Sequence, residues 1–544
     1  MNLGVYLVCG IVAALCYMIY RGWPRPIAGI PYYKPSAKTF FGDAKTISEY
    51  VTEHKTVIAW ILERGRQLDS PIFQILVPFN NPLIVVTDYR ESQDVMARRT
   101  KEFDRSTIFE STFGGTVPEH HIHMQTNDRW RAQRKLLADT MSSSFLQSVG
   151  AGHLHNHALQ LMDLWRVKSK LGSGHAFTVA DDINQMALDA IWATAFGSDI
   201  NTIKTQTDYL ETANVDLPLS SEGPVVFGKP ELPADYDALI YVTDAITTAV
   251  QSSFPVQAHW LARQKKAYKQ AKGHTNKLVA DALADAKLRF MTNEATDDMI
   301  KCATDNMVRR EQQAALKENR NPGFDSPAAK DELLGFLLAG HDTTSTTIMW
   351  GVKFLTDHPE VQDKARRIIR QSYPDEAASG TIPSADAIYK TSIPYLDAVI
   401  EEILRQSGTI PMSSRKTTTD VQLLGHRIPK GVDVFFMSHC SGYTEPDLFS
   451  DRIDDAVRSQ SSRETKTRVG AWDPEDVRLF KPERWIKVDE SGQEVFDPHA
   501  GPAHPFGAGV RGKCFFCSDS SPCDGKVFIG CCIRICTTSL TIFF

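Results

Sequence analysis

The chain has 544 residues, of which 42% are hydrophobic and 23% are charged, as is ordinary for a folded globular protein. Its formal net charge of −6 gives no reason to expect nucleic acid as a partner. Six of the ten cysteines lie between Cys514 and Cys536. Because so few remain elsewhere, we expect a reducing compartment and no disulfide framework.

The run from Leu3 to Tyr20 is uncharged and mostly apolar, and it has roughly the length of a helix that crosses a bilayer. Arg21 and Arg25 follow at once, which favours a cytosolic position for the rest of the chain. The alternative is a cleaved secretory peptide, but no basic residues precede the run and no small-residue cleavage site follows it. We therefore predict a transmembrane anchor over residues 1–23 and a stiff Pro-rich hinge over residues 24–36.

Residues 55–103 mix helical and strand patterns. Apolar spacing predicts a helix over Val57–Leu68, and β-rich segments predict strands at Ile72–Val77 and Leu83–Val86. The stretch from Phe103 to His123 has the glycines and proline of a loop. Its histidines invite a metal-site hypothesis, but they are too close together to form one tetrahedral site without outside ligands. We therefore favour a surface loop for His120, His121 and His123.

A basic segment, DRWRAQRKLL, follows this loop. Trp130 and Arg134 are four residues apart, so on a helix they share one face. The simpler interpretation is an amphipathic helix with a solvated basic face. The alternative is that the indole N–H and the guanidinium bind carboxylates together.

The stretch ELLGFLLAGHDTTSTTIMW, from Glu332 to Trp350, is apolar at helical spacing but is interrupted at its centre. Ala339 and Gly340 give up burial, and Asp342 begins a polar group whose hydrogen bonds compete with the helix. Such a cost within an apolar helix favours a functional site over a merely kinked core helix.

Two further stretches carry charged residues at helical or turn spacing. EEILR places Glu402 and Arg405 three residues apart on one helix face, and FKPERW contains Arg484. An isolated pair of this kind is usually a surface pair that contributes little. A proline four residues before Arg415 starts a separate Pro-x-x-x-Arg step.

The remaining patterns define the fold class. Val179–Phe196 is the clearest of several long helical patterns, whereas Val421–Phe436 alternates as short strands do, with turns at its glycines. We interpret the charged, Ser/Thr-rich segment Arg452–Val469 as an inserted surface loop. The chain is therefore predicted to be mainly α with small β-sheets (α+β).

The stretch HPFGAGVRGKC ends at Cys514. A thiolate at the end of a tight, Gly-rich turn is a good axial ligand for haem iron. The stretch resembles the haem-binding loop of the cytochrome P-450 superfamily, Phe-x-x-Gly-x-Arg-x-Cys-x-Gly, with Phe506, Gly509 and Arg511 in place. The family pattern has its cysteine at the position of Lys513, one residue before Cys514.

The other motifs resemble the same family in the same order, over roughly residues 25–512. The resemblance implies the P-450 fold, a catalytic domain over residues 37–512 and haem b (iron-protoporphyrin IX) as the cofactor. It implies Cys514 as the iron ligand, displaced by one residue, and the contacts of Phe506 with the haem. The residues that would hold the haem propionates are Trp130, Arg134, Arg415 and Arg511.

The same resemblance assigns roles in the interrupted helix and in the charged stretches. Ala339 and Gly340 would leave room for dioxygen beside the iron. Thr343 would hold the bound oxygen, and Asp342 would relay protons from solvent. A buried, purely structural triad would consist of Glu402, Arg405 and Arg484.

Residues 513–544 match nothing that follows the cysteine in this family. A zinc module is one interpretation, since Cys514 and Cys517 have zinc-type spacing, but the later cysteines form no second neat pair. A diverged but folded end is another. We favour a gene-model artefact, because the codons of Gly512, Lys513 and Cys514 can spell GGT-AAG-TGY, which contains the usual start of an intron.

The resemblance implies a microsomal, fungal-type monooxygenase that inserts one atom of O2 into a small apolar substrate, in secondary-metabolite biosynthesis. NADPH-cytochrome P-450 reductase would supply electrons, since no flavin or nicotinamide fingerprint is present. We expect a single-pass protein of the endoplasmic reticulum membrane with its catalytic domain in the cytosol. One alternative is a catalytically dead haem- or ligand-binding membrane protein. Another is an enzyme of rearrangement or dehydration, against which the Asp342–Thr343 pair argues.

Overall fold

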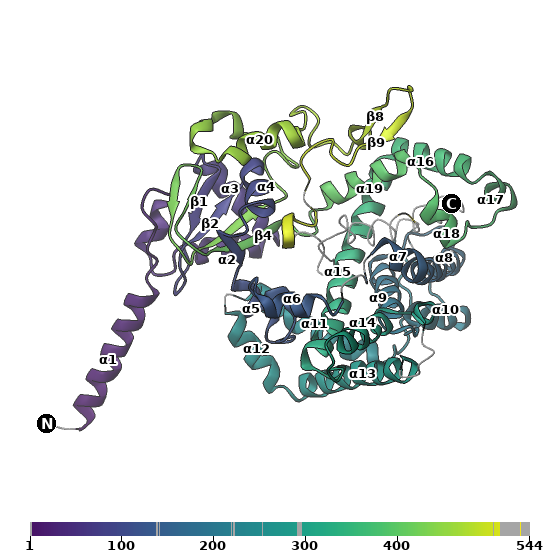
Figure 1. The fold of residues 1–544 in the computed structure, drawn as a ribbon, viewed down its shortest axis with the longest axis horizontal. Coiled ribbons are helices and arrows are strands. Elements are labelled where there is room, and N and C mark those ends of the chain that lie inside the picture. Colours follow the sequence, from purple (N-terminus) through teal and green to yellow (C-terminus); the bar gives the residue numbers. More distant parts are fainter. Residues whose placement is uncertain are drawn as a thin grey trace. The chain divides into compact units, whose positions relative to one another are not determined.

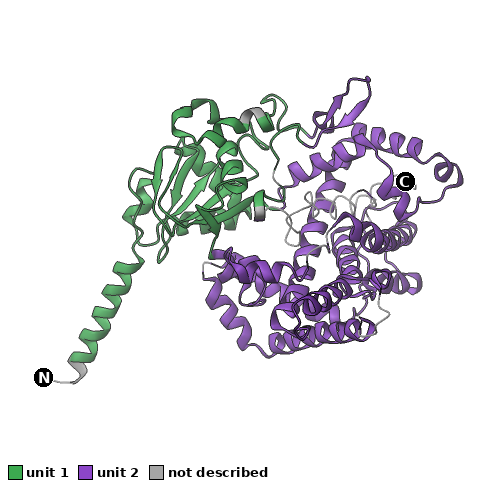
Figure 2. Cartoon of the chain, viewed as in Figure 1, with its two compact units in different colours: residues 1–107, 410–479, 499–510 green, residues 108–409, 480–498, 511–544 purple. Residues whose placement is uncertain are grey.

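The computed structural model describes residues 3–137, 140, 142–218, 220, 223–252, 254–290, 296–503, 505–511 and 534. The chain divides into two compact units (Figure 2). Unit 1 consists of Met1–Thr107, Ile410–Leu479 and His499–Val510. Unit 2 consists of Ile108–Thr409, Phe480–Pro498 and Arg511–Phe544. Each unit is therefore built from segments that lie far apart in the sequence.

Unit 1 contains a mixed five-stranded sheet in the order β1-β2-β7-β4-β3 (Figure 1). Strand β2 pairs antiparallel with β1 and parallel with β7, where Ile84 lies opposite Val434. The strands of unit 1 are β1 (Ile72–Ile75), β2 (Leu83–Val86), β3 (Phe103–Arg105), β4 (Met412–Thr417), β5 (Val421–Leu423), β6 (His426–Ile428) and β7 (Asp433–Met437). The helices are α1 (Leu3–Gly22), α2 (Ala44–His54), α3 (Val57–Gln67), α4 (Tyr89–Ala97) and α20 (Gln460–Val469).

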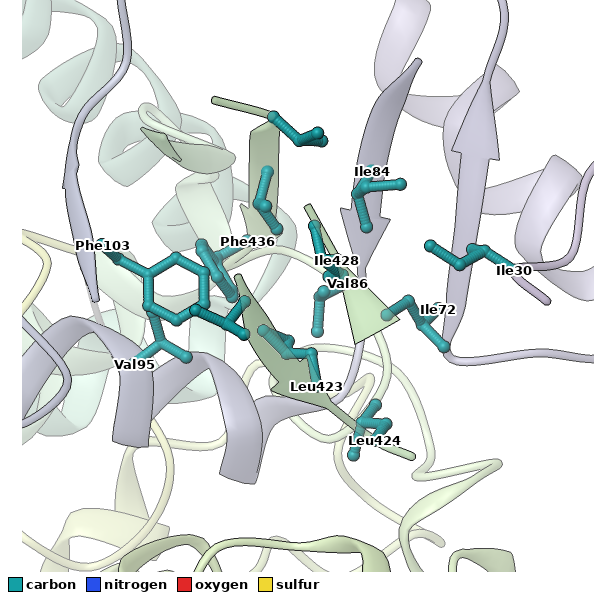
Figure 3. Close-up of a cluster of buried hydrophobic side chains, with 13 residues drawn as sticks. Ile30, Ile72, Ile84, Val86, Val95, Phe103, Leu423, Leu424, Ile428 and Phe436 are labelled. Carbon is teal, nitrogen blue, oxygen red and sulfur yellow. The ribbon is translucent and has the colours of Figure 1, made fainter. Parts of the chain in front are cut away.

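The β-branched and aromatic side chains of these strands build the core of unit 1. One face of the sheet buries Ile84, Val434 and Phe436, and the Phe103 ring meets the Phe436 ring edge-on at 5.8 Å (Figure 3). The hairpin of β5 and β6 contributes Leu423 and Ile428 to the same cluster. The predicted strands and the predicted helix at residue 57 are confirmed.

Helix α1 occupies the position of the predicted anchor, and side chains such as Leu7, Ile11 and Leu15 are exposed. None of the helices in the described part of the chain is long and apolar enough to cross a membrane. The transmembrane helix predicted over residues 1–23 is therefore not found.

The segment predicted as an inserted surface loop folds onto α4 instead. The Arg458 guanidinium donates to both carboxylate oxygens of Asp88, at 2.8 and 2.6 Å, and both side chains are fully buried. Ser462, in α20, donates to Glu91 at 2.7 Å. The prediction was wrong here because the partners of these charges lie some 370 residues earlier in the chain, beyond the reach of any local pattern.

Unit 2 is mostly helical, with the two-stranded ribbon β8 (Ile486–Val488) and β9 (Glu494–Phe496). Its longer helices are α8 (Ala151–Gly172), α9 (Ala180–Phe196), α10 (Thr202–Thr212), α11 (Ala234–Gln251), α12 (Pro255–Gln264), α13 (Lys266–Phe290), α14 (Ala303–Lys317), α15 (Pro327–Asp357), α16 (Pro359–Ser372) and α19 (Pro394–Ser407). Its short helices are α5 (Ile108–Phe113), α6 (Asp128–Arg134), α7 (Ser143–Phe145), α17 (Pro374–Ser379) and α18 (Ala385–Lys390).

Helices α15 and α9 pack against each other in unit 2. Almost every residue of α9 is buried, as expected of a helix that is apolar all round. Helix α15 begins at Pro327 behind the Ser326 cap, whose side chain accepts a hydrogen bond from Ala329 N. The helices predicted over Val179–Phe196 and Glu332–Trp350 are thus confirmed, and α15 extends beyond its prediction at both ends.

Candidate functional site

Helix α6 carries Trp130 and Arg134 on one buried face. The Asn127 side chain caps the helix by accepting a hydrogen bond from Trp130 N at 2.8 Å. The Arg134 guanidinium lies 5.1 Å from the Trp130 ring centroid. Only 6% of Trp130 and 8% of Arg134 are exposed, so the solvated basic helix is excluded for these two residues.

Arg511 joins the same indole from the far end of the sequence. Its guanidinium carbon lies 4.6 Å from the Trp130 ring centroid. Its Nε donates to Thr126 Oγ1 and its Nη2 donates to Met124 O, each at 2.8 Å. Two guanidiniums therefore meet at one indole, and this donor set suits a ligand that carries carboxylates.

The interrupted part of α15 remains helical. Thr343 Oγ1 donates to Ala339 O at 2.8 Å, and Thr347 Oγ1 donates to Thr343 O at 2.8 Å. Such bonds to the preceding turn satisfy threonine hydroxyls within a helix. The Asp342 side chain is 56% exposed and lies against the buried His341 imidazole. The Asp342 carboxylate is thus in contact both with solvent and with a buried side chain of the same helix.

Gly340 lies where α15 crosses α9. A Cβ at this position would lie 2.6 Å from Ile191 Cγ1, so any larger residue would force the Ile191 side chain to shift. Close helix packing is therefore one physical reason for the glycine. That Ala339 and Gly340 also leave room for dioxygen stays a prediction.

The charged stretches come together around Glu402. Its carboxylate accepts from Arg405 Nε at 2.8 Å and Nη2 at 2.7 Å, and from Arg484 Nε at 3.2 Å. The Trp485 indole and the Lys481 backbone N–H add bonds of 2.9 Å each. All three charged side chains of the predicted triad are buried. The arrangement is a satisfied ionic network without access to a ligand, which suits a structural role.

The sequence matches the cytochrome P450 family over residues 57–451. The chain belongs to this family. It is 36% identical to the cytochrome P450 monooxygenase GME11363 of Pestalotiopsis microspora, over 94% of this chain and 89% of that protein. It is 35% identical to the cytochrome P450 monooxygenase TRI13 of Fusarium sporotrichioides, over 93% and 90% of the two chains. The chain is thus an oxidoreductase of the P450 monooxygenase class.

Solved P450 structures resemble the fold. The haem domain of cytochrome P450DA aligns with a TM-score of 0.61 at 17% sequence identity, over 90% of this chain and 87% of that one. A second crystal structure of a cytochrome P450 aligns with a TM-score of 0.62 and covers 90% of this chain. The predicted P450 fold, mainly helical with small sheets, is confirmed.

P450 proteins bind haem, so the family implies this cofactor here. The cluster of Trp130, Arg134 and Arg511 fits the two propionates of a haem by its donor groups and its positive charge. Trp130 and Arg134 also line a cleft of about 1160 Å³ between α6 and α14. Among the described residues, neither Asp342 nor Thr343 lines this cleft.

Two predicted haem contacts of the P450, Arg415 and Phe506, belong to unit 1. Arg415 is buried in β4 of unit 1, where its Nη1 donates to Ser414 O at 3.0 Å. Phe506 also belongs to unit 1 and is half-buried. Gly509 has φ +68°, and a Cβ there would overlap Met96 O, so the loop requires a glycine.

Cys514 lies outside the described residues, and its role as iron ligand stays a prediction.

The histidine loop is not a surface loop, which corrects the sequence interpretation. His120 and His121 are buried, and His121 Nδ1 lies 2.6 Å from Glu332 Oε2 of α15. His123 instead hydrogen-bonds Val117 O at 3.0 Å. Burial raises the pKa of the Glu332 carboxyl to about 7, against the lowering effect of His120. The additional ligand group that local sequence did not reveal is the Glu332 carboxylate, 211 residues away from His121.

Two residues that contact the predicted site residues were not predicted from the sequence, although the sequence contained a pattern that could have indicated each of them. Trp485 directly follows Arg484, and a buried indole N–H needs an acceptor, which here is Glu402. His341 stands between Gly340 and Asp342, and a titratable residue beside the predicted proton relay was visible in the sequence. The contact of His121 with Glu332 had no sequence signal.

Proposed function

We propose that this P450 is a haem-thiolate monooxygenase that inserts one oxygen atom of O2 into a small apolar organic substrate. The observation that carries the proposal is the pair of guanidiniums, Arg134 and Arg511, against the Trp130 indole. Haem, when bound, supplies the oxygen chemistry, and a thiolate ligand favours O–O cleavage. Electrons would come from NADPH through NADPH-cytochrome P450 reductase.

The chain's own residues have two tasks: some bind the haem carboxylates and others transfer protons. Trp130, Arg134 and Arg511 hold carboxylates, with Arg415 as a further propionate contact. The exposed carboxylate of Asp342 takes up protons from solvent, and the Thr343 hydroxyl passes them to the oxygen site. Cys514 is the residue we assign as the iron ligand.

We also propose a role in secondary metabolism at the endoplasmic reticulum membrane. A relative from Dothistroma septosporum, 37% identical over 39% of this chain, is named an Hps1-dma1 cluster cytochrome P450 monooxygenase. The exposed apolar side chains of α1 and Arg21 in its last turn support attachment to a membrane, with the catalytic domain in the cytosol. Deleting residues 1–23 would then release the protein from the membrane fraction.

One observation favours a second function, that of a haem- or ligand-binding protein without turnover. The family pattern has its cysteine at the position of Lys513, whereas this chain has it at Cys514. A cysteine one residue out of the family register would leave the position of the iron ligand to Lys513, which cannot supply a thiolate. A gene-model artefact is the competing explanation of the shifted cysteine: residues 513–544 would be a translated intron, and the native ligand would come from the spliced message.

A carbon monoxide difference spectrum of the reduced full-length protein tests both functions. The monooxygenase predicts the red-shifted Soret band of thiolate ligation. That band is lost in Cys514→Ala and is kept or strengthened when Lys513 is deleted, which places the cysteine in the family register. Absence of the band from both the native chain and the deletion variant overturns the proposal.

Turnover and substrate need a second experiment. The protein would be coexpressed with the reductase, and the metabolites that accumulate on gene deletion would be supplied as substrates. Oxygenation of one of them with consumption of NADPH supports the monooxygenase. A normal thiolate spectrum without turnover of any of them favours the binding protein.

A further inference from the structure

Two imidazoles and a carboxylate meet inside unit 2, and none of the three residues is among those assigned to haem or oxygen. His121 Nδ1 lies 2.6 Å and His120 Nε2 lies 3.5 Å from the same oxygen of Glu332, Oε2. The possible ligand atoms of the three residues lie within 4.8 Å of one another, and all three residues are buried. They come from η2 (His121–His123), the residue that caps it, and α15.

The backbone around this cluster is fixed. The Glu119 backbone N–H donates to Asp331 at 2.8 Å, and the His121 backbone N–H donates to Glu332 Oε1 at 2.7 Å. The consecutive carboxylates of Asp331 and Glu332 in α15 therefore fix the position of the loop backbone at Glu119 and His121. One turn along, Gly335 leaves the space that the His120 ring occupies, since a Cβ there would overlap the ring. The cluster is preorganised by the chain around it.

Imidazole nitrogens and a carboxylate oxygen are the preferred ligands of zinc-type divalent cations. A tetrahedral ion would take three ligands from the protein and a water as the fourth. A buried carboxylate needs a compensating positive charge, and a bound cation supplies one. We propose that His120, His121 and Glu332 form a binding site for a divalent transition-metal ion of the zinc class.

Binding changes the hydrogen bonds of both rings. His120 Nδ1 accepts from Ile122 N at 3.0 Å, so its neutral ring carries the proton on Nε2. To bind a cation through Nε2, the ring gives up this loop bond and moves its proton to Nδ1. The ion also replaces the bond from His121 Nδ1 to Glu332. The two backbone bonds to Asp331 and Glu332 Oε1 are independent of these changes and keep the loop in place.

The ion would fasten the loop before α6 to α15. It does not depend on haem, so this site and the proposed monooxygenase fail or succeed separately. His123 provides a matched control because it lies in the same loop but turns to Val117 O.

The test is the metal content of the full-length protein after expression with zinc, measured by mass spectrometry following removal of loose metal. We expect about one tightly held ion per chain in the native protein and in His123→Asn. Glu332→Gln and His121→Asn should fall to the background of the buffer. A native protein without zinc, or a folded Glu332→Gln protein that keeps it, overturns the proposal.

Cobalt distinguishes this cluster from the cysteines after Cys514, which are the other candidate ligands. Bound to His120, His121 and Glu332, cobalt gives visible d–d bands without thiolate charge-transfer bands in the near ultraviolet. Charge-transfer bands that persist in Glu332→Gln assign the metal to cysteines and overturn the site. Should Glu332→Gln fail to fold, the native cobalt spectrum still decides between the two ligand sets.

Discussion

The His341 imidazole lies 2.9 Å from the Asp342 carboxylate, measured from Nε2 to Oδ1. Only 4% of the His341 side chain is exposed, whereas 56% of Asp342 is. The pair therefore couples a buried ring to a solvated acid at the centre of α15. An imidazole in this position restrains the carboxylate that we assign to proton uptake.

Replacing His341 should uncouple electron consumption from oxygenation. In His341→Leu, Asp342 loses its partner and protons arrive less reliably, so more hydrogen peroxide is released per NADPH consumed. Asp342→Asn removes the acid itself and should slow product formation by about 10²-fold. Peroxide and NADPH would be assayed together in the reconstituted system, with haem content as the control. Unchanged peroxide yield in His341→Leu beside an impaired Asp342→Asn would contradict this role.

Removing the carboxylate at the centre of the Glu402 network should destabilise unit 2 severely. In Glu402→Ala the guanidiniums of Arg405 and Arg484 are left buried without their counter-charge, at a cost of roughly 3–5 kcal/mol. Urea unfolding followed by circular dichroism measures it. The control is Asp357→Asn, which breaks an exposed pair with Lys353 and should cost below about 1 kcal/mol. Equal losses in the two variants would refute the buried network.

Haem retention should depend on Arg134 and not on its neighbour Arg131. Arg134→Ala removes a buried guanidinium from the Trp130 cluster, whereas Arg131 is exposed and pairs with Asp128. Loss of one charge-assisted carboxylate bond should weaken haem binding by roughly tenfold or more. The ratio of Soret to protein absorbance after gel filtration reports it. A similar loss from Arg131→Ala would show that general positive charge suffices.

The buried acid Glu91 should make stability depend on pH. Burial raises its pKa from 4.5 to about 7, outweighing the effects of Ser462 and Arg99. Between these two values the folded state binds more protons than the unfolded state, so the contribution of Glu91 to stability is lost as the pH rises through this interval. By about pH 7.5 the loss amounts to roughly 3 kcal/mol at most.

Glu91→Gln removes this titration, so its unfolding free energy should vary less than that of the native protein between about pH 5 and about pH 7.5. Urea titrations at both pH values measure the difference. Parallel pH profiles for the two proteins would mean that Glu91 stays ionised throughout, held by Arg99 at 3.1 Å.

Sequence patterns were sufficient where neighbours along the chain determine the outcome. The apolar periodicity of α15 and the β-rich run of β2 were predicted directly, because a buried helix stripe and a buried strand each have a local sequence pattern. Arg134 beside Trp130 followed from helical spacing in the same way. Glu402 with Arg484 followed only from the family resemblance, since 82 residues separate them.

The failures share one physical cause. His121 and Arg458 were assigned to solvent because each sits in a polar, loop-like sequence, yet each finds a carboxylate hundreds of residues away, Glu332 and Asp88. A buried charge is stable only with its partner, and local composition does not reveal a distant partner.

The parallel pairing of β2 with β7 has a consequence for synthesis. Val434 follows its partner Ile84 by 350 residues, so the ribosome works for roughly 20–70 s between the two strands. Throughout that interval β2 lacks the strand that covers its edge in the folded protein, so any β1–β2 hairpin that has formed presents an apolar, unpaired edge. The yield of soluble enzyme will therefore depend on chaperone supply and translation speed during this window, and nascent chains that stop before β7 will aggregate through the edge of β2.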